Sequence, residues 1–358
     1  MAKDTDFSSA STALAYYQGP NPMKLDKKAL LFALSLVLSI SGSQAAPDPA
    51  LEVDTIRYQS FSGGQVIFAE LADALGYLAP LKLNRLGIVT GGPADIQATA
   101  TDQVDFGQSF NGAILNAYAA GAPIRAVIGY HGSNQEHYYG AWVLADGPIR
   151  KASDLVGKTV GVNTLGAAAQ AYVEKYLEQG KLSAADQKKV TLVPIPPPNA
   201  EQALRQGQLD AAVLNGGFQQ LAEQRGGLRR LFSDYDLFGN YTFASVVMSQ
   251  EFLKKNPKTS RHFVGALARA IEWSQTQPRE KVIEVYSAYL AKGGRNDQVP
   301  AIKLWDTQAV HNKGGWISKD EFSRWADWLQ AQGRLKPGQI KVEDVYTNEF
   351  NPYFPAGK

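Results

Sequence analysis

The chain has 358 residues, of which 44% are hydrophobic and 20% are charged, and its formal net charge at pH 7 is +2. This length suits two domains of about 150 residues each, and a charge so close to zero excludes a strongly basic surface for nucleic acid. The sequence holds no cysteine, which excludes disulfides, thiolate chemistry, cysteine-bound metals and a lipid anchor on cysteine.

The N-terminal part follows the pattern of a secretory signal peptide. Lys24, Lys27 and Lys28 precede an apolar run over residues 29–40, and small residues follow up to Ala45. A basic segment, a short apolar run and a small-residue cleavage site in this order direct a chain to export. The run is too short for a transmembrane helix, which needs about 20 apolar residues.

We therefore expect a signal peptide over residues 23–45, cleavage after Ala45 and a mature protein in the periplasm. Residues 1–22 are polar, lack periodicity and stand ahead of a second methionine, Met23. Since a signal peptide normally begins the chain, this extension is interpreted either as disordered or as the product of an ambiguous translation start.

Strands and helices alternate through the first half of the mature chain, as the periodicity of apolar residues and the positions of glycine indicate. The expected elements are strands over 55–58 and 86–89, a helix over 66–75, a short helix after Gly91, a strand after Asp105, a helix over 113–120 and a strand over 124–128. A polar stretch over 130–137 leads into a strand over 139–145, which we interpret as the crossover into a second lobe.

The second half continues this alternation and ends in a helical region. The expected elements are a helical turn and a strand within 149–162, a helix that ends at Gln179, strands over 190–195 and 211–214, a strand over 243–248 that returns to the first lobe, and helices across 257–333. Ser318 and Glu321 have the spacing of a capping box, and we expect the aromatic side chains after them to pack in the core. The tail from residue 337 is expected to lie as an extended strap over the first lobe.

Two segments of the sequence repeat each other at a constant offset of 105 residues. The matched pairs are Pro93 and Pro198, Gln97 and Gln202, Ala98 and Ala203, Gln103 and Gln208, Asp105 and Asp210, and Gly112 and Gly217. Each copy predicts a turn, a short helix, a strand after the aspartate and a small polar loop, although short biased segments also align by chance. Two such units imply two similar α/β lobes, and ligands of open α/β sheets bind beyond the carboxyl ends of the strands.

Enzyme and metal motifs are incomplete in this sequence. The Gly-Lys-Thr at 157–159 lacks the earlier glycine of a phosphate-binding loop and precedes an expected strand instead of a helix. Residues 107–112 resemble a nucleophile elbow with the wrong spacing. His131 and His137 lack the spacing of metal ligands, so a solvated or pocket-lining role is favoured for them over a metal site.

Several short motifs occur in the order and spacing of a known family. They are Ile56-Arg57-Tyr58-Gln59, Gly92-Pro93 with Val104-Asp105-Phe106-Gly107, Ala120-Gly121-Ala122-Pro123, Asp154-Leu155 with Gly157-Lys158 and Val160-Gly161-Val162, and Gln208-Leu209-Asp210-Ala211. Behind a signal peptide, they resemble the periplasmic substrate-binding proteins of ABC importers for nitrate, taurine, aliphatic sulfonates and thiamine precursors. The resemblance extends over residues 53–352.

The resemblance implies an α/β fold of two lobes, the type II periplasmic-binding-protein fold, with two crossover strands and a helical C-terminal part. It places lobe 1 over 46–140 plus 246–358 and lobe 2 over 141–245, and the lobes of such proteins close on a ligand by hinge motion. The implied partners are a small-molecule ligand and an ABC permease in the inner membrane. We expect a monomer with no cofactor, no metal and no catalytic residue.

The ligand-facing positions that the resemblance implies lie in short loops and at helix starts. They are Gln59, Ser60, Phe61, Ser62, Gly92, Pro93, Ser109, Phe110, Asn111, Asn163, Thr164, Gly166, Ala167, Asn215, Gly216 and Thr242. Backbone N–H groups at helix starts can hold an anion, although Ser62 taken alone is better interpreted as a helix cap. Because none of these positions is Lys or Arg, we expect neutral dipoles to hold the ligand.

Two loops depart from those of the sulfonate-binding members of the family. Residues 166–168 read Gly-Ala-Ala and residues 215–217 read Asn-Gly-Gly, where the family often carries larger or more polar side chains. Small residues leave room for a ligand larger than taurine unless the backbone collapses inward. An apolar wall for such a ligand is expected from Phe61, Phe110, Phe218 and Tyr241.

The favoured hypothesis is the capture of a small organic anion, with a sulfonate or sulfate-ester head and room for an aromatic body, for delivery to a permease. The alternatives are a binding protein for nitrate or for a pyrimidine or thiamine precursor and, in a different class, an enzyme on the same fold. An enzyme would need a placed acid, base or nucleophile in its cleft, and the sequence marks none.

Overall fold

The first lobe is built on two groups of strands in a computed structural model that describes residues 50–61, 64–89 and 91–355. Strands β1 (Thr55–Phe61) and β2 (Lys82–Val89) form a parallel pair. Strands β3 (Phe106–Phe110) and β4 (Ile124–Ser133) flank β10 (Tyr241–Ser249), which runs antiparallel to both. The expected signal peptide, the extension before it and Ser62 lie outside the described residues.

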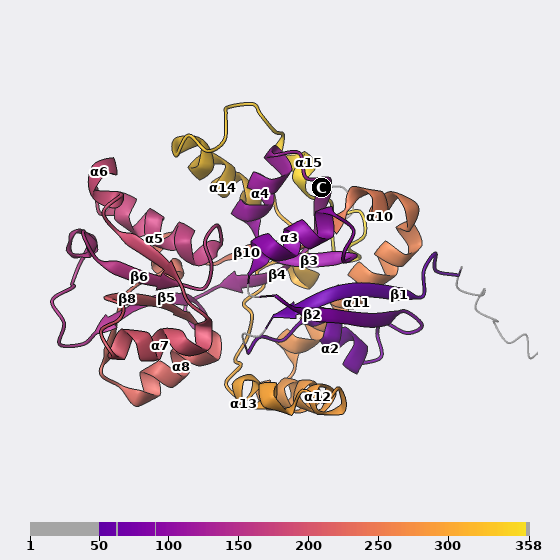
Figure 1. Ribbon diagram of the computed structural model, residues 1–358. Helices are drawn as coiled ribbons and strands as arrows, with labels where there is room; N and C mark the ends of the chain where they lie inside the picture. The colour runs from indigo at the N-terminus through magenta and orange to yellow at the C-terminus, as the bar shows by residue number, and fades with distance from the viewer. Residues whose placement is uncertain (1–49, 62–63, 90, 356–358) are drawn as a thin grey trace, which may run out of the picture. The chain divides into compact units, whose positions relative to one another are not determined.

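The second lobe holds a five-stranded sheet in the order β7-β6-β8-β5-β9. Its strands are β5 (Tyr139–Leu144), β6 (Thr159–Val162), β7 (Thr191–Pro194), β8 (Ala211–Asn215) and β9 (Leu228–Ser233). Strands β6, β7 and β8 are parallel, and β5 pairs antiparallel with β8 and β9. In Figure 1 this sheet and its helices lie on the left, and the strands of the first lobe lie on the right.

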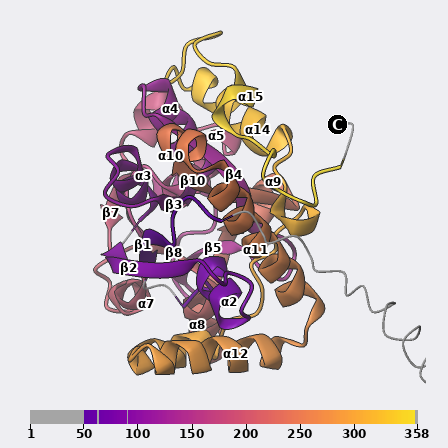
Figure 2. The same ribbon diagram turned by 90° about the vertical axis from the view of Figure 1, so that its right-hand side faces the viewer.

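Helices pack on the strands of both lobes. Those of the first half are α2 (Phe68–Ala74), α3 (Gly92–Ala100), α4 (Asn111–Ala119), α5 (Ala168–Gln179), α6 (Ala184–Gln187) and α7 (Pro197–Arg205), with the 3-10 turn η1 (Ala152–Leu155). Those of the second half are α8 (Gly216–Arg225), α9 (Asp234–Phe238), α10 (Gln250–Lys255), α11 (Pro257–Thr276), α12 (Arg279–Lys292), α13 (Val299–Ile302), α14 (Asp320–Ala331) and α15 (Val342–Val345), with η2 (Asn296–Gln298) and η3 (Lys313–Gly315). Helix α12 lies beneath α2 in Figures 1 and 2, and the two are in contact.

The repeat that the sequence shows is present in the structure at the same offset. Helix α3 begins at Gly92 and α7 at Pro197, and strand β3 begins one residue after Asp105 just as β8 begins one residue after Asp210. The two aspartates hold equivalent positions. Asp105 accepts the Arg57 N–H of β1 at 2.6 Å, and Asp210 accepts the Thr159 N–H of β6 at 2.9 Å. The repeated aspartate therefore ties each repeat strand to a neighbouring strand of its own lobe.

The polar loop expected after each repeat strand is absent from the described chain. Helix α4 begins at Asn111, directly after β3 ends at Phe110, and α8 begins at Gly216, directly after Asn215. The residues that were expected to form these two loops lie instead at the ends of the strands and in the first turns of the helices.

The first crossover lies earlier in the chain than the sequence suggests. Strand β5 pairs over its whole length with β8 and β9 and so belongs to the second sheet. The chain therefore crosses over at residues 134–138, after β4. The return strand over 243–248 is confirmed as part of β10, whose Tyr241 pairs with Ser133.

The C-terminal region is only partly helical. Residues 305–311 form a segment without regular secondary structure between α13 and η3. Gly132 N–H donates to the Gln308 carbonyl, which fixes this segment beside β4. The capping box is half formed: Glu321 accepts the Ser318 N–H at 3.2 Å. Its aromatic neighbours pack in the core as expected, with Trp325 fully buried. The tail runs over the first lobe, where Tyr346 bridges Ala126 of β4.

The structure confirms the mixed α/β fold of two lobes. Residues 51–358 form one compact unit by themselves. Within the described residues, no helix is both long enough and apolar enough to span a membrane.

Candidate ligand-binding cleft

A small cavity of about 70 Å³ lies between the two lobes. The first lobe contributes Phe61, Gln65, Gly91, Gly92, Gln108, Ser109, Phe110, Tyr130, His131, Phe243 and Ala244 to its lining, and the second contributes Tyr139, Asn163, Ala167 and Ala168. A cavity needs about 10–15 Å³ on this measure to hold one water molecule. In this closed arrangement, the cavity therefore has room for a small group such as the head group of an anion.

Three helices begin at the wall of this cavity. The N-cap residues of α3, α4 and α5 are Gly91, Phe110 and Ala167, and within the described chain none of them receives a side-chain capping bond. The first N–H groups of a helix have no partner inside the helix and carry a partial positive charge. Such N–H groups are suited to hold the oxygens of an anion.

Ser109 is the polar side chain that most clearly lacks a protein partner at the cavity. It is 2% exposed, and its Oγ finds no hydrogen bond among the described residues. Gly92 is its close neighbour, since a Cβ placed on Gly92 would lie 2.2 Å from that Oγ. A buried hydroxyl without a partner costs stability, so a ligand that supplies the partner would recover this energy.

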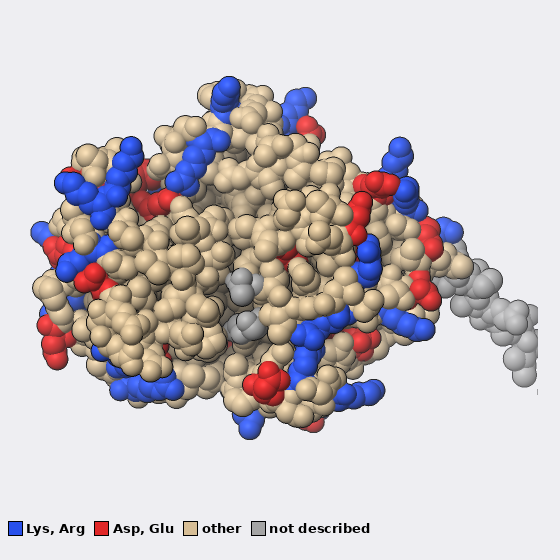
Figure 3. Space-filling model, viewed as in Figure 1, with Lys and Arg blue, Asp and Glu red and all other residues tan. Residues whose placement is uncertain are grey.

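The cavity is nearly uncharged. Among the described residues that line it, none is Lys, Arg, Asp or Glu. In Figure 3 the charged side chains lie mainly around the periphery of the visible face, and the middle of that face is mostly uncharged. His131 also lines the cavity. Burial, helped by the nearby His137, lowers the pKa of His131 well below its ordinary value, which keeps its ring neutral.

Aromatic rings form the apolar part of the lining. The ring of Tyr139 packs edge-on against Phe243, with centroids 5.4 Å apart, and Phe110 packs edge-on against Trp325 at 4.5 Å. Burial raises the pKa of Tyr139 well above the ordinary value. These rings give the cavity fixed walls.

Six of the sixteen residues expected from the sequence line the cavity. They are Phe61, Gly92, Ser109, Phe110, Asn163 and Ala167. A further six are absent from the lining: Gln59, Pro93, Thr164, Gly166, Asn215 and Gly216. Gly166 faces Pro93, because a Cβ placed on Gly166 would lie 3.6 Å from the Pro93 ring. The approach of the other lobe therefore fills space that the small residues leave.

Three expected ligand residues are engaged inside the first lobe instead. The Asn111 amide donates to the Glu321 carbonyl at 3.1 Å and accepts from Ser245 at 2.8 Å. The Ser60 hydroxyl accepts from Arg85 at 2.7 Å, and the Thr242 hydroxyl accepts from the His311 N–H at 3.0 Å.

These side chains are buried and have partners, so their role in the structure is to hold the first lobe together. Tyr241 and Phe218 are likewise absent from the cavity lining, and Tyr139 and Phe243 provide the aromatic wall instead.

Most of the lining residues that the sequence did not mark lie on strands, whereas Gln65 lies in the loop before α2. Gln108 immediately precedes Ser109 on β3, and Tyr130 and His131 belong to the last part of β4. Their signal in the sequence is a polar or aromatic residue inside an otherwise apolar strand. Of the two roles left open for His131, the structure supports the pocket-lining one. The described residues contain no group of three or more His, Asp or Glu side chains able to hold a metal ion.

The lobes touch each other on several sides of the cavity. A Cβ placed on Gly91 would lie 2.3 Å from Thr164 Cγ2, so these two loops are in close contact. Farther out, Arg334 forms an ion pair with Glu174 at 2.9 Å. The two lobes are therefore in direct contact, an arrangement that we call closed.

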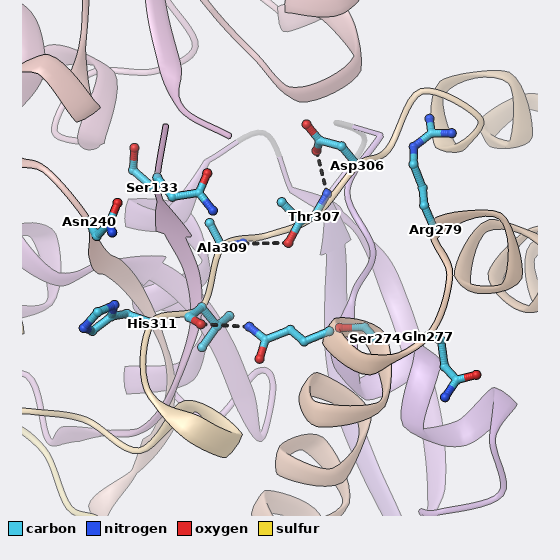
Figure 4. Close-up of a pocket in the computed structure, with 12 residues that line it drawn as sticks. Ser133, Asn240, Ser274, Gln277, Arg279, Asp306, Thr307, Ala309 and His311 are labelled. Carbon is cyan, nitrogen blue, oxygen red and sulfur yellow. Dashed lines mark hydrogen bonds between the residues drawn. The ribbon is translucent and has the colours of Figure 1, made fainter. Parts of the chain in front are cut away.

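A second pocket of about 390 Å³ lies at the hinge. Its walls include Ser133 at the end of β4, Asn240 just before β10, and the segment that carries Asp306 and Thr307 (Figure 4). This hinge pocket is polar and open, and its Asp306 is linked through His137 to His131 of the cavity.

The family model described as NMT1/THI5 like matches residues 67–281, which is more than half of the chain. The chain belongs to the NMT1/THI5-like family. This confirms the resemblance found in the sequence. A relative from Brucella abortus, which carries only the general name of a binding protein, is 24% identical over 275 residues, covering 74% of this chain and 80% of the relative.

Solved structures of periplasmic binding proteins have the same fold. The alkanesulfonate-binding protein SsuA from Xanthomonas axonopodis pv. citri, bound to MOPS, is 20% identical and has a TM-score of 0.64, covering 83% of this chain and 99% of SsuA. The periplasmic nitrate-binding protein NrtA from Synechocystis PCC 6803 is 12% identical and has a TM-score of 0.67, covering 84% of this chain and 88% of NrtA. At these identities the likeness concerns the fold.

The same fold also serves an enzyme. The desulfurization enzyme DSZB is 17% identical and has a TM-score of 0.59, covering 83% of this chain and 97% of DSZB. The fold alone therefore does not decide between binding and catalysis.

Proposed function

We propose that this protein is the periplasmic solute-binding component of an ABC importer and that it captures a small organic anion with a sulfonate or sulfate-ester head. The observation that carries the proposal is the convergence of three uncapped helix starts on one closed, uncharged cavity, beside the unpartnered hydroxyl of Ser109. Backbone N–H groups and a hydroxyl are donors that suit the oxygens of such a head group.

The aromatic lining supports a ligand with an apolar body. The rings of Phe61, Phe110, Tyr139 and Phe243 line the cavity, and binding sites commonly bury an apolar body while a few polar contacts fix its orientation. Since the closed cavity measures about 70 Å³, a body larger than the head group requires the lobes to stay slightly apart. The same small volume favours nitrate as the second candidate.

We further propose that the chain is exported by its signal peptide, acts as a monomer, and delivers the ligand to a permease without chemical change. The cavity supports binding over catalysis because its titratable lining consists of His131 and tyrosines. Within the described residues, no cavity-lining serine or cysteine has a histidine partner.

Isothermal titration calorimetry with benzenesulfonate, phenyl sulfate, taurine and nitrate tests the proposal directly. We expect saturable binding of benzenesulfonate or phenyl sulfate, with unchanged ligand recovered afterwards. Tight binding of nitrate alone would favour the second candidate, and conversion of the ligand into a product would show an enzyme.

A further inference from the structure

Three side chains form a continuous hydrogen-bonded chain from the ligand cavity to the hinge pocket. His131 Nε2 lies 2.9 Å from His137 Nε2, and His137 Nδ1 lies 2.9 Å from Asp306 Oδ1. His131 lines the cavity, and Asp306 lines the hinge pocket (Figure 4). This hydrogen-bonded chain of titratable groups therefore joins the two spaces.

This hydrogen-bonded chain of His131, His137 and Asp306 also crosses between the lobes. His131 belongs to β4, and His137 lies in the crossing segment at residues 134–138. Asp306 comes from the C-terminal segment, and its second oxygen accepts from the Gln220 amide of α8 at 3.1 Å. A change of charge within the chain therefore acts on the cavity and on the contact between the lobes at once.

The number of protons that the three side chains carry allows this hydrogen-bonded chain two protonation states. Burial alone would raise the pKa of Asp306, but the hydrogen bond and the charge of His137 outweigh it and lower that pKa, so the carboxyl is ionised. An ionised carboxyl only accepts hydrogen bonds, and His137 Nδ1 must therefore carry a proton. The state of His137 Nε2 then sets the direction of the bond between the two rings.

In the first state both rings are neutral. His131 Nε2–H donates to His137 Nε2, which leaves His131 Nδ1 as a bare acceptor. In the second state one more proton has entered at His131 Nδ1, and the shared proton has moved from His131 Nε2 to His137 Nε2. The positive charge then rests on His137 beside the Asp306 carboxylate, and His131 Nδ1–H is a donor.

We propose that protonation of this chain turns His131 into a hydrogen-bond donor toward the cavity, so that the protein takes up one proton when it captures an anion. This inference rests on the proposed capture of an anion in the cavity. Binding of the proton strengthens binding of the anion, and the reverse, for two reasons. The anion accepts a hydrogen bond from His131 Nδ1–H, and the net charge of the three side chains has changed from −1 to zero. By linkage, the affinity is highest at low pH and falls as the pH rises through the apparent pKa of the chain.

Other titratable groups also face the chain. From the strands these are Tyr130 and Tyr139, from α9 Asp234, from α8 Glu223, and across the hinge pocket Arg279 and His311. The exposed Glu136 is next to His137 in the sequence. Asp234 matters most, since burial raises its pKa to about 6. A pH-dependent affinity alone would not separate Asp234 from the histidines, so the test must observe the imidazole rings themselves.

The first experiment observes the four histidine rings of ligand-free protein by NMR after labelling with ¹⁵N-histidine. As the pH is lowered and the hydrogen-bonded chain takes up a proton, we expect His131 to stay neutral and to change from the Nε2–H to the Nδ1–H tautomer. Signals are assigned with His131→Gln and His137→Gln. A His131 ring that keeps one tautomer throughout, or that becomes charged itself, would overturn the proposal.

The second experiment measures the affinity for benzenesulfonate between pH 5.5 and 8.5 in buffers without a sulfonate group. The probe stays ionised over this range, so any change belongs to the protein. We expect the affinity to fall by up to tenfold for each pH unit above the apparent pKa, and calorimetry in two buffers of different ionisation enthalpy should show uptake of a proton. His137→Gln should remove both effects, and Asp306→Asn should move the fall to lower pH.

His311→Gln is the matched control, because His311 is an exposed ring of the hinge pocket outside the chain, and Asp234→Asn separates the neighbouring carboxyl. Binding that does not depend on pH, or a pH dependence that survives in His137→Gln and disappears in Asp234→Asn, would overturn the proposal. A tautomer change without any binding of benzenesulfonate would contradict the proposed ligand class and leave the chain itself confirmed.

Discussion

Ser109 and Asn111 stand two residues apart and have opposite surroundings. The Ser109 hydroxyl lines the cavity without a partner in the described chain, whereas Asn111 is 0% exposed and has partners on both sides of its amide. The sequence suggested both as ligand residues, since both are polar and lie close to a strand end. Neighbours in sequence therefore play different roles, because one side chain points into the cavity and the other into the lobe.

For Ser109→Ala, we expect a clear loss of affinity with little change in stability. A hydrogen bond to a charged group contributes about 1.5–3 kcal/mol, which corresponds to roughly ten- to hundredfold in the dissociation constant. Stability should hold because the hydroxyl has no protein partner to lose. Calorimetric titration and urea unfolding measure the two quantities, and an unchanged affinity would remove Ser109 from the binding site.

For Asn111→Ala, we expect a loss of stability with little change in affinity. The substitution leaves the Ser245 hydroxyl and the Glu321 carbonyl without their partner in the core, which should lower the free energy of unfolding by about 1–3 kcal/mol. The affinity of the folded protein should stay close to that of the parent, as measured at a temperature where both are fully folded. A weaker affinity with full stability would restore the ligand role that the sequence suggested.

Single residues were the hardest feature to predict from the sequence. Glycine and serine near helix starts led to Gly92 and Ser109, which line the cavity, because anion sites depend on backbone N–H groups that any short residue leaves accessible. Tyr139 also lines the cavity but was not predicted, since its place there depends on how two lobes approach each other. No local pattern carries that information.

At the scale of elements, the repeated aspartates explain why two short motifs predict two lobes. Asp105 and Asp210 each accept the N–H of the neighbouring strand and each donate their own N–H back to that strand at 2.9 Å. Each also pairs with a basic side chain, Arg57 at 2.7 Å and Lys158 at 3.2 Å. The aspartate must stand directly before the repeat strand to make these bonds to the neighbouring strand. This fixed spacing made the two repeat strands predictable from the sequence.

We expect Asp105→Ala to lower the free energy of unfolding more than Asp210→Ala. Both leave a strand N–H without its partner, which costs about 1–3 kcal/mol when that group is buried. Asp105 is the more buried of the two, and it accepts from the Arg57 backbone and from two guanidinium nitrogens. Chemical denaturation measures the difference, with the exposed Asp146→Ala as control. Equal losses at both positions would show that the side-chain pair of Asp105 adds nothing.

Element boundaries at strand-to-helix junctions were less predictable than the elements themselves. The sequence around Gly112 and Gly217 looks like a loop because glycine is common in turns. Both glycines instead lie inside the first turn of a helix. Gly217 is required there by a close approach, because a Cβ at that position would lie 2.8 Å from Leu304 Cβ of the other lobe.

At the scale of the whole molecule, the two lobes meet through contacts outside the cavity. These include the pair of Arg334 with Glu174 and the bond from Gln220 to Asp306. The number of lobes and the fold were predictable from the repeat and the family motifs. The degree of closure was not, since it depends on shape complementarity between surfaces that are far apart in the sequence.

Gly217 offers a way to hold the lobes apart without touching the cavity, because it is absent from the cavity lining and packs against Leu304 and the Ala301 carbonyl. In Gly217→Leu, the added side chain would occupy the space that the other lobe fills in the closed form. We expect the dissociation constant for the best-binding anion to rise by at least tenfold, because the closed state that binds the ligand becomes a minor population. Small-angle X-ray scattering should show that ligand makes the parent protein more compact and leaves the variant extended.

Gln224→Leu, at an exposed position of the same helix, is the matched control and should behave as the parent does. If Gly217→Leu bound the ligand as tightly as the parent and became equally compact, closure of the lobes would not be coupled to binding.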